Sequence, residues 1–387
     1  MRTKVFDEFT KLFGTEGDIR VFFAPGRVNL IGEHTDYNGG HVFPCALTIG
    51  TYMVIRRRED NVMRLYSMNF ETEGIKEVTL EEMQDKKDLG WTAYPVGIVW
   101  SLKEKGFAVD KGFDVLYYGT IPNGSGLSSS ASIEVVTTYA LSKLWGFDIS
   151  GVEIAKLSQF SENQFNKVNC GIMDQFAVAM GKEDHAIYLD TATLDYRYAP
   201  IKLDGEKIVI MNTNKRRELG DSKYNERRSE CQKALELLQS VTSIDSLGDL
   251  SIEEFEEKKA VIQDPVLTKR AKHAVYENQR TMQAVKALEE KDLNSFGKLM
   301  VESHDSLRDD YEVTGKELDA LVEETLKCDG VIGARMTGAG FGGCAVSIVK
   351  NESVEDVISK VGKNYLDRIG YAAEFYVVSV GDGPKEL

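Results

Sequence analysis

Residues 113–132 read FDVLYYGTIPNGSGLSSSAS, an apolar run followed by a segment rich in glycine and serine. The run 113–121 predicts a strand that ends at Pro122, and residues 131–145 predict a helix that Gly146 stops. Glycines between a strand and a helix start leave several backbone N–H groups free at the positive end of a helix dipole, where proteins hold phosphate. No G-x-x-x-x-G-K-[ST] pattern occurs, so this is not a Walker A loop. A capped helix after a Gly/Ser turn remains the open alternative.

The segments around this loop alternate between strand and helix patterns, which predicts an α+β fold. Residues 50–58 read as a strand, and a capping box formed by Ser150 and Glu153 starts a helix that runs to about residue 166. In the second half, residues 207–213 predict a strand, residues 221–327 a long charged helical region, and residues 330–349 a Gly-dense turn followed by a strand. Residues 195–205 show little periodicity. We therefore expect two domains, residues 1–200 and 201–387.

Residues 338–343, GAGFGG, satisfy the dinucleotide-binding pattern G-x-G-x-x-G. That pattern has its meaning only after a strand and at the start of a helix. Here the glycines run into the strand-like CAVSIV, so we predict a turn between elements that can approach a ligand.

Composition narrows the class of protein. The chain has 387 residues, a formal net charge of -15 and 42% hydrophobic residues, which is typical of a globular enzyme. The negative charge argues against nucleic acid or an anionic membrane as a partner, although a local nest of amides can still hold a small polyanion. The five cysteines are scattered without a C-x-x-C pair, and no apolar run is long enough to span a membrane. We expect a cytoplasmic protein without a disulfide framework or zinc site.

The N-terminus has acidic residues where a signal peptide needs an apolar core. Phe6, Phe9 and Phe13 instead fall at helical spacing, which predicts a short amphipathic helix packed on the body.

Residues 24–40, APGRVNLIGEHTDYNGG, concentrate polar side chains between glycines. Carboxylates and a histidine at this density could bind a polyol, ligate a cation or decorate a polar loop. Carboxylates suit sugars because their oxygens accept several hydroxyl hydrogen bonds. One histidine and two acids match no recognisable metal spacing.

Residues 26–37 resemble the galactokinase signature. Residues 122–132 resemble the second motif of the GHMP small-molecule kinases, and residues 333–343 resemble their third. The three motifs occur in the expected order over nearly the whole chain. The resemblance implies a two-domain GHMP kinase fold, with an N-terminal half like the second domain of ribosomal protein S5 and a ferredoxin-like C-terminal half. It also implies phosphorylation of the C1 hydroxyl of α-D-galactose by MgATP, the first committed step of galactose catabolism, without an obligate protein partner.

The resemblance further implies roles for individual residues. Asp174 would be the catalytic carboxylate, and Arg27 would lie between it and the transferred phosphoryl group. The sugar would be bound by Glu33, His34, Thr35, Asp36, Gly171 and Tyr224. The nucleotide would be held by Ser67, Gly124, Ser125, Gly126, Leu127, Ser128, Ser129 and Ser130. Ser130 and Glu162 would bind Mg²⁺. Two alternatives remain: a kinase for a related sugar such as N-acetylgalactosamine, and a catalytically silent galactose sensor.

Overall fold

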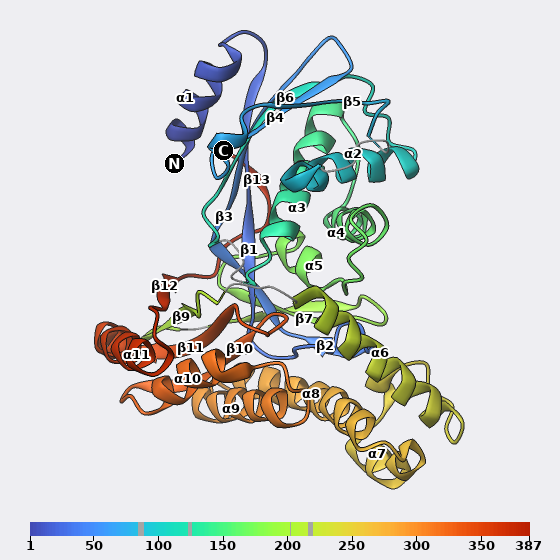
Figure 1. The fold of residues 1–387 in the computed structure, drawn as a ribbon, viewed down its shortest axis with the longest axis vertical. Coiled ribbons are helices and arrows are strands. Elements are labelled where there is room, and N and C mark those ends of the chain that lie inside the picture. The colour runs from blue at the N-terminus through green and yellow to red at the C-terminus, as the bar shows by residue number, and fades with distance from the viewer. Residues whose placement is uncertain (84–88, 123–125, 202, 216–219) are drawn as a thin grey trace.

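A six-stranded sheet forms the N-terminal half, in the order β13-β1-β3-β6-β4-β5 (Figure 1). The computed structural model describes the whole chain apart from residues 84–88, 123–125, 202 and 216–219. Helices α2–α5 cover one face of the sheet and α1 packs on the other. The elements of this half, in chain order, are α1 (Arg2–Phe13), β1 (Ile19–Asn29), β2 (His41–Val42), β3 (Pro44–Arg57), β4 (Val62–Ser67), β5 (Lys76–Thr79), α2 (Ala93–Glu104), β6 (Phe113–Gly119), α3 (Ser129–Trp145), α4 (Gly151–Phe160), α5 (Met173–Ala179), β7 (His185–Asp190) and β8 (Tyr196–Pro200).

A four-stranded sheet in the order β10-β11-β9-β12 forms the C-terminal half, with helices packed against it (Figure 1). Its elements are β9 (Glu206–Asn212), α6 (Gly220–Gln239), α7 (Ile252–Lys258), α8 (Pro265–Glu289), α9 (Leu293–Asp309), α10 (Gly315–Leu326), β10 (Val331–Thr337), β11 (Cys344–Lys350), α11 (Val354–Ile369) and β12 (Glu374–Val378). Strand β13 (Lys385–Glu386) returns to the N-terminal sheet and pairs with β1.

Local sequence signals around the loop are confirmed. Ser150 caps α4 and exchanges hydrogen bonds with Glu153 as a capping box, and Gly146 ends α3 in the left-handed region. A π-helical turn, Ser161–Phe165, continues α4. Residues 338–343 join the antiparallel strands β10 and β11, so the rejection of a dinucleotide loop is also confirmed.

The N-terminal helix is present, but its inward face differs from the prediction. Val5, Phe9 and Phe13 are buried, whereas Phe6 is 37% exposed. The i, i+4, i+8 spacing of Val5, Phe9 and Phe13 makes one continuous face, and Phe6 lies to the side of it.

The two halves share a hydrophobic cluster. Val28 and Phe43 of the first half belong to the same buried cluster as Ile210 and Val346 of the second. This shared cluster packs the two halves directly against each other. Strand β8 lies inside the segment 195–205, and the domain boundary proposed there remains a prediction.

Candidate active site

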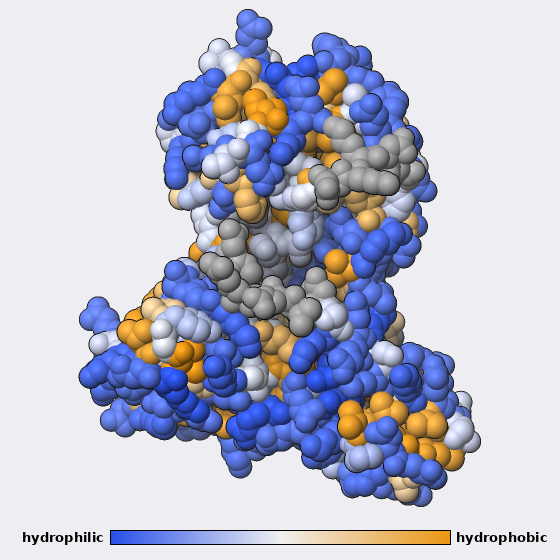
Figure 2. Space-filling view, viewed as in Figure 1, coloured by the Kyte–Doolittle hydropathy of each residue, from blue (hydrophilic) through white to orange (hydrophobic). Residues whose placement is uncertain are grey.

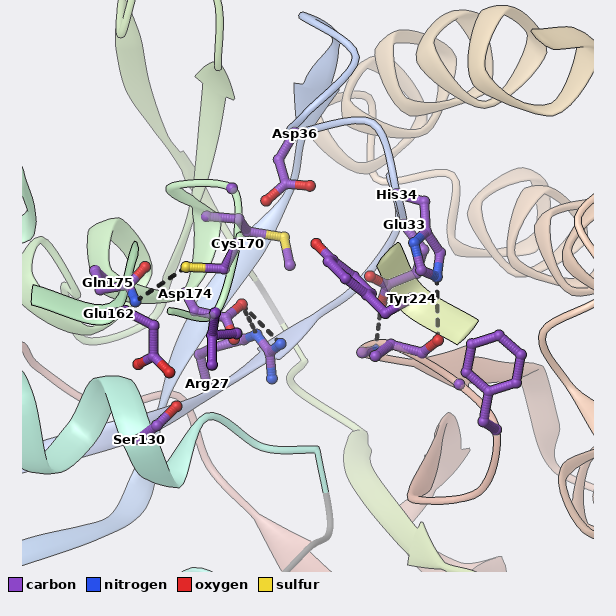
Figure 3. A pocket seen from close by; sticks show the side chains of 17 residues that line it. Arg27, Glu33, His34, Asp36, Ser130, Glu162, Cys170, Asp174, Gln175 and Tyr224 are labelled. Atoms are coloured by element: carbon purple, nitrogen blue, oxygen red, sulfur yellow. Dashed lines mark hydrogen bonds and ion pairs between the residues drawn. The ribbon is translucent and has the colours of Figure 1, made fainter. Parts of the chain in front are cut away.

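Nine of the predicted site residues line one cavity of about 170 Å³, with walls from both halves (Figure 3). They are Arg27, Glu33, His34, Asp36, Ser130, Glu162, Gly171, Asp174 and Tyr224. They come from β1 and the loop after it, the first turn of α3, the π-helical turn after α4, the loop before α5 and its first turn, and α6. The β10–β11 turn closes the cavity with Gly338, Ala339, Gly340 and Phe341.

Arg27 and Asp174 form the central ion pair of the cavity. Arg27 Nη2 lies 2.7 Å from Asp174 Oδ1, and Arg27 Nε donates to the same oxygen at 3.0 Å. Ser128 Oγ donates to Asp174 Oδ2 at 2.5 Å. Both carboxylate oxygens are therefore held, which fixes the orientation of Asp174 at the first turn of α5.

Gly126 and Leu127, just before α3, also contact Arg27. The Arg27 side chain donates through Nη1 to the carbonyl of Gly126 at 2.6 Å, and its backbone N–H donates to the carbonyl of Leu127 at 3.2 Å. Ser128 is the N-cap of α3 and has φ 60°, so the chain turns sharply just before the helix starts. Gly124 and Ser125 lie outside the described residues.

The turn between β10 and β11 approaches this loop closely. A Cβ on Gly338 would lie 2.9 Å from the Gly126 carbonyl oxygen, and φ at Gly338 is +85°. Only glycine fits this close approach and this conformation without strain.

Glu33 is held by the C-terminal half. Its Oε1 accepts hydrogen bonds from Thr337 Oγ1 at 3.0 Å and the Gly338 N–H at 2.9 Å, and Arg335 Nη1 lies 3.3 Å away. Glu33 and Arg335 are almost fully buried. The carboxylate that the sequence assigned to sugar thus also ties the loop after β1 to strand β10.

Thr35 faces away from the cavity. Its Oγ1 is fully buried and shares its one hydrogen between the carbonyls of Gly32 and His41, so the hydroxyl stabilises the turn after β1. The structure does not bring this predicted sugar ligand to the cavity wall.

Asp36 faces the cavity from above in Figure 3 and packs against Gly171. A Cβ on Gly171 would lie 1.9 Å from Asp36 Oδ2. Burial, and then the charges of Asp174 and Glu33, raise the pKa of Asp36 to about 7. An acid with this pKa changes charge near neutral pH.

Tyr224 and His34 line the cavity next to each other, with ring centroids 5.7 Å apart. Burial raises the pKa of the Tyr224 hydroxyl well above its usual value, so it stays protonated and can donate or accept a hydrogen bond. Burial lowers the pKa of His34 to about 3, so its imidazole is neutral.

Ser130 and Glu162 line the cavity on the side of α3 and α4. Glu134, which the sequence analysis missed, is fully buried beside them; burial, and then the charge of Glu162, raise its pKa well above the usual value. A hydroxyl and a carboxylate are oxygen donors that suit Mg²⁺. Among the described residues, no group of three or more His, Cys, Asp or Glu side chains could hold a metal by itself.

A second cavity, of about 160 Å³, adjoins the first through Ser130. Ser67, which the family resemblance places near the nucleotide, lines it, and so does Ser129. The sequence did not predict the other nine residues that line this cavity: Thr51, Asn69, Phe70, Trp91, Tyr94, Tyr117, Gly119, Ile121 and Ile133. Phe70 and Trp91 are nearly parallel, with centroids 6.5 Å apart. No short motif contains these residues, because they come from separate strands and helices.

Three family models match the chain. The galactokinase galactose-binding signature matches residues 7–57, the GHMP kinase N-terminal domain residues 93–182, and the GHMP kinase C-terminal model residues 284–367. A galactokinase of Clostridium beijerinckii is 59% identical over 380 residues, which is 98% of this chain and 97% of that protein. The chain belongs to the galactokinase family.

Solved structures confirm the two-domain GHMP kinase fold. The galactokinase of Lactococcus lactis complexed with galactose is 48% identical, with a TM-score of 0.98 over 100% of this chain and 99% of that one. The mevalonate kinase of Methanococcus jannaschii is 20% identical, with a TM-score of 0.67 over 95% and 99% of the two chains, and this likeness concerns the fold alone. The predicted family, fold class and kinase activity are therefore confirmed, and the roles of single residues remain predictions. No helix among the described residues is long and apolar enough to cross a membrane.

Proposed function

We propose that this galactokinase-family chain transfers the terminal phosphoryl group of ATP to the C1 hydroxyl of α-D-galactose, giving galactose 1-phosphate, ADP and a proton. The observation that carries the proposal is the single cavity in which the Arg27–Asp174 pair faces Asp36 and Tyr224. Charged acceptors and a neutral phenol on opposite walls suit a polyhydroxyl ligand.

ATP would span the two adjoining cavities. The second cavity is lined by flat side chains such as Phe70 and Trp91, which suit a purine base, and Ser130 belongs to both cavities. The phosphates would then lie at the start of α3, where the helix dipole and backbone N–H groups favour an anion. Residues 124–130 would hold the triphosphate there.

Ser130 and Glu162 would hold Mg²⁺ beside the phosphates, since their oxygens line the cavity on the same side. When bound, the ion neutralises charge on the phosphate oxygens.

Asp174 would orient the C1 hydroxyl and accept its proton. Arg27 and Ser128 already hold the two carboxylate oxygens, so the remaining lone pairs of Asp174 point in fixed directions. Arg27 would also neutralise negative charge that develops on the transferred phosphoryl group. Phosphoryl transfer has a loose transition state, so positioning and charge neutralisation contribute most of the acceleration.

A sugar with an acetamido group at C2 would need extra room near Asp174 and Gly171. One coupled ADP-release assay tests the proposal across galactose, N-acetylgalactosamine, glucose, homoserine and mevalonate. We expect release with galactose in large excess over the others. Preference for N-acetylgalactosamine would support the related-sugar alternative. Absence of ADP release with every compound, combined with galactose binding in calorimetry, would identify a silent sensor.

A further inference from the structure

A chain of hydrogen bonds runs behind the His34 wall of the cavity. The Sγ atom of Cys231 lies 3.1 Å from the hydroxyl of Tyr311, which lies 2.7 Å from the hydroxyl of Tyr37. The Tyr37 hydroxyl in turn lies 2.7 Å from His34 Nδ1. Cys231 lies on α6, Tyr311 follows α9, and Tyr37 lies in the loop between β1 and β2. We call Cys231, Tyr311 and Tyr37 the relay.

The donors and acceptors allow only one direction of hydrogen-bond donation, from Cys231 towards His34. His34 Nε2 lies 3.2 Å from the carbonyl oxygen of Ala339, which can only accept, so the proton of the neutral imidazole is on Nε2. Nδ1 must then accept from the Tyr37 hydroxyl. Tyr37 donates its only hydroxyl hydrogen to His34, so its oxygen must accept a hydrogen bond from Tyr311.

The thiol of Cys231 is the last donor of this hydrogen-bonded series. Tyr311 donates to Tyr37, so the Tyr311 oxygen accepts from the thiol of Cys231. Burial raises the pKa of this thiol to about 11, which keeps it protonated as the donor. Cys231 and Tyr311 are each at most 1% exposed, so water does not offer them other partners.

The relay also packs directly on the cavity wall. The ring of Tyr311 lies 4.8 Å from the His34 ring, and the ring of Tyr37 lies 5.5 Å from Tyr224. His34 has φ 61°, so its backbone is in the left-handed region that a residue with a side chain rarely adopts. The relay and the Ala339 carbonyl therefore hold both ring nitrogens of a residue on an unusual backbone.

We propose that the relay is a positioning device that fixes His34 as the Nε2–H tautomer, with a single ring orientation at the wall of the sugar pocket. Without the relay, part of the population would have a rotated or Nδ1–H imidazole, and the apparent affinity for sugar would fall by the lost fraction. The kinetic consequence rests on the proposed function, whereas the tautomer does not.

The first test is the tautomer itself, read by ¹⁵N NMR of the full chain with ¹⁵N-labelled histidine. The protein has five histidines, and His34→Gln assigns the signal of interest by its disappearance. We expect an Nε2–H imidazole between pH 6 and 8 in the wild-type protein, and a mixture of tautomers or exchange broadening in Tyr311→Phe. An Nδ1–H signal in the wild type, or an unchanged signal in Tyr311→Phe, would overturn the proposal.

The second test is steady-state kinetics. In Tyr311→Phe we expect KM for galactose to rise about 3- to 10-fold, the loss of one buried hydrogen bond, with kcat and KM for ATP within about 2-fold of wild type. Tyr365→Phe is the matched control: its buried hydroxyl donates to the Thr213 carbonyl at 2.8 Å, away from the cavity, so galactose KM should not change. Equal effects of the two variants would overturn the positioning role.

Two substitutions of Cys231 keep the proposal testable if Tyr311→Phe does not fold. Cys231→Ser retains a donor and should keep a galactose KM close to wild type, whereas Cys231→Ala removes the donor and should raise it. Equal galactose KM values and equal His34 spectra in the serine and alanine variants would overturn the relay. If the wild type phosphorylates no galactose, the proposed function fails while the NMR result still decides the relay.

Discussion

Replacing Asp36 by asparagine should stabilise the protein at alkaline pH and weaken it as a sugar binder. Burial and the charges of Asp174 and Glu33 raise the pKa of Asp36 from 3.8 to about 7. The folded state therefore binds the proton more tightly than the unfolded chain, so ionisation costs stability as pH rises from about 4 to about 7. Three pKa units correspond to about 4 kcal/mol as an upper bound.

The measurable gain should be smaller than this bound. The cavity borders the carboxylate and admits solvent, and the backbone N–H groups of Met173 and Tyr37 already stabilise the ionised form. An amide also offers those donors one oxygen instead of two. We expect Asp36→Asn to raise the free energy of unfolding by about 1–2 kcal/mol at pH 8, which for a chain of this length raises Tm by about 1–2.5 °C, and by much less at pH 4.5.

Thermal unfolding of wild type and variant at pH 4.5 and 8 checks this, with the exposed Asp195→Asn as control. Galactose KM should rise about 10- to 100-fold in Asp36→Asn, because a charged acceptor contributes about 1.5–3 kcal/mol to a hydrogen bond. A Tm gain of the same size at both pH values would refute the reasoning from the raised pKa. An unchanged galactose KM would refute the assignment of Asp36 to the sugar.

Four further predictions concern other parts of the site. Asp174→Asn should lower kcat at least ~100-fold while calorimetry still detects galactose binding, and near-normal kcat in a folded variant would contradict its role. Gly171→Ala would place a Cβ 1.9 Å from an oxygen of Asp36. Galactose KM should therefore rise at least ~10-fold with little change in KM for ATP. Unchanged kinetics would show that Asp36 can move without loss of sugar binding. Arg335→Leu removes the fully buried cation beside two buried glutamates and should cost about 3–5 kcal/mol in denaturant unfolding; a loss below about 1 kcal/mol would contradict this. Trp91→Ala should raise KM for ATP about 10-fold with galactose KM unchanged, and the opposite pattern would exclude the second cavity as the nucleotide site.

Short segments of sequence predicted much of this fold and site. The strand and the helix that flank the Gly/Ser segment, Phe113–Gly119 and Ser129–Trp145, and the capping box at Ser150 are confirmed, because such signals depend on neighbours within a few residues. All four glycines of residues 338–343 have positive φ, a conformation that glycine adopts without strain. The turn that the sequence predicted there is therefore confirmed. The family resemblance also named nine residues that gather in one cavity.

The sequence by itself therefore determined the local elements and the family, and the phosphate-binding role of the Gly/Ser loop remains a prediction. Only the tertiary structure decided which groups meet. Asp174 receives Arg27 from 147 residues away and Ser128 from 46, and Tyr37 meets Tyr311 across 274. Tertiary packing also directs the Thr35 hydroxyl away from the cavity. The same packing brings together the aromatic side chains of the second cavity, which no sequence motif connects. The physical reason is that backbone turns and caps are local, whereas cavities, buried ion pairs and hydrogen-bond relays depend on packing between distant elements.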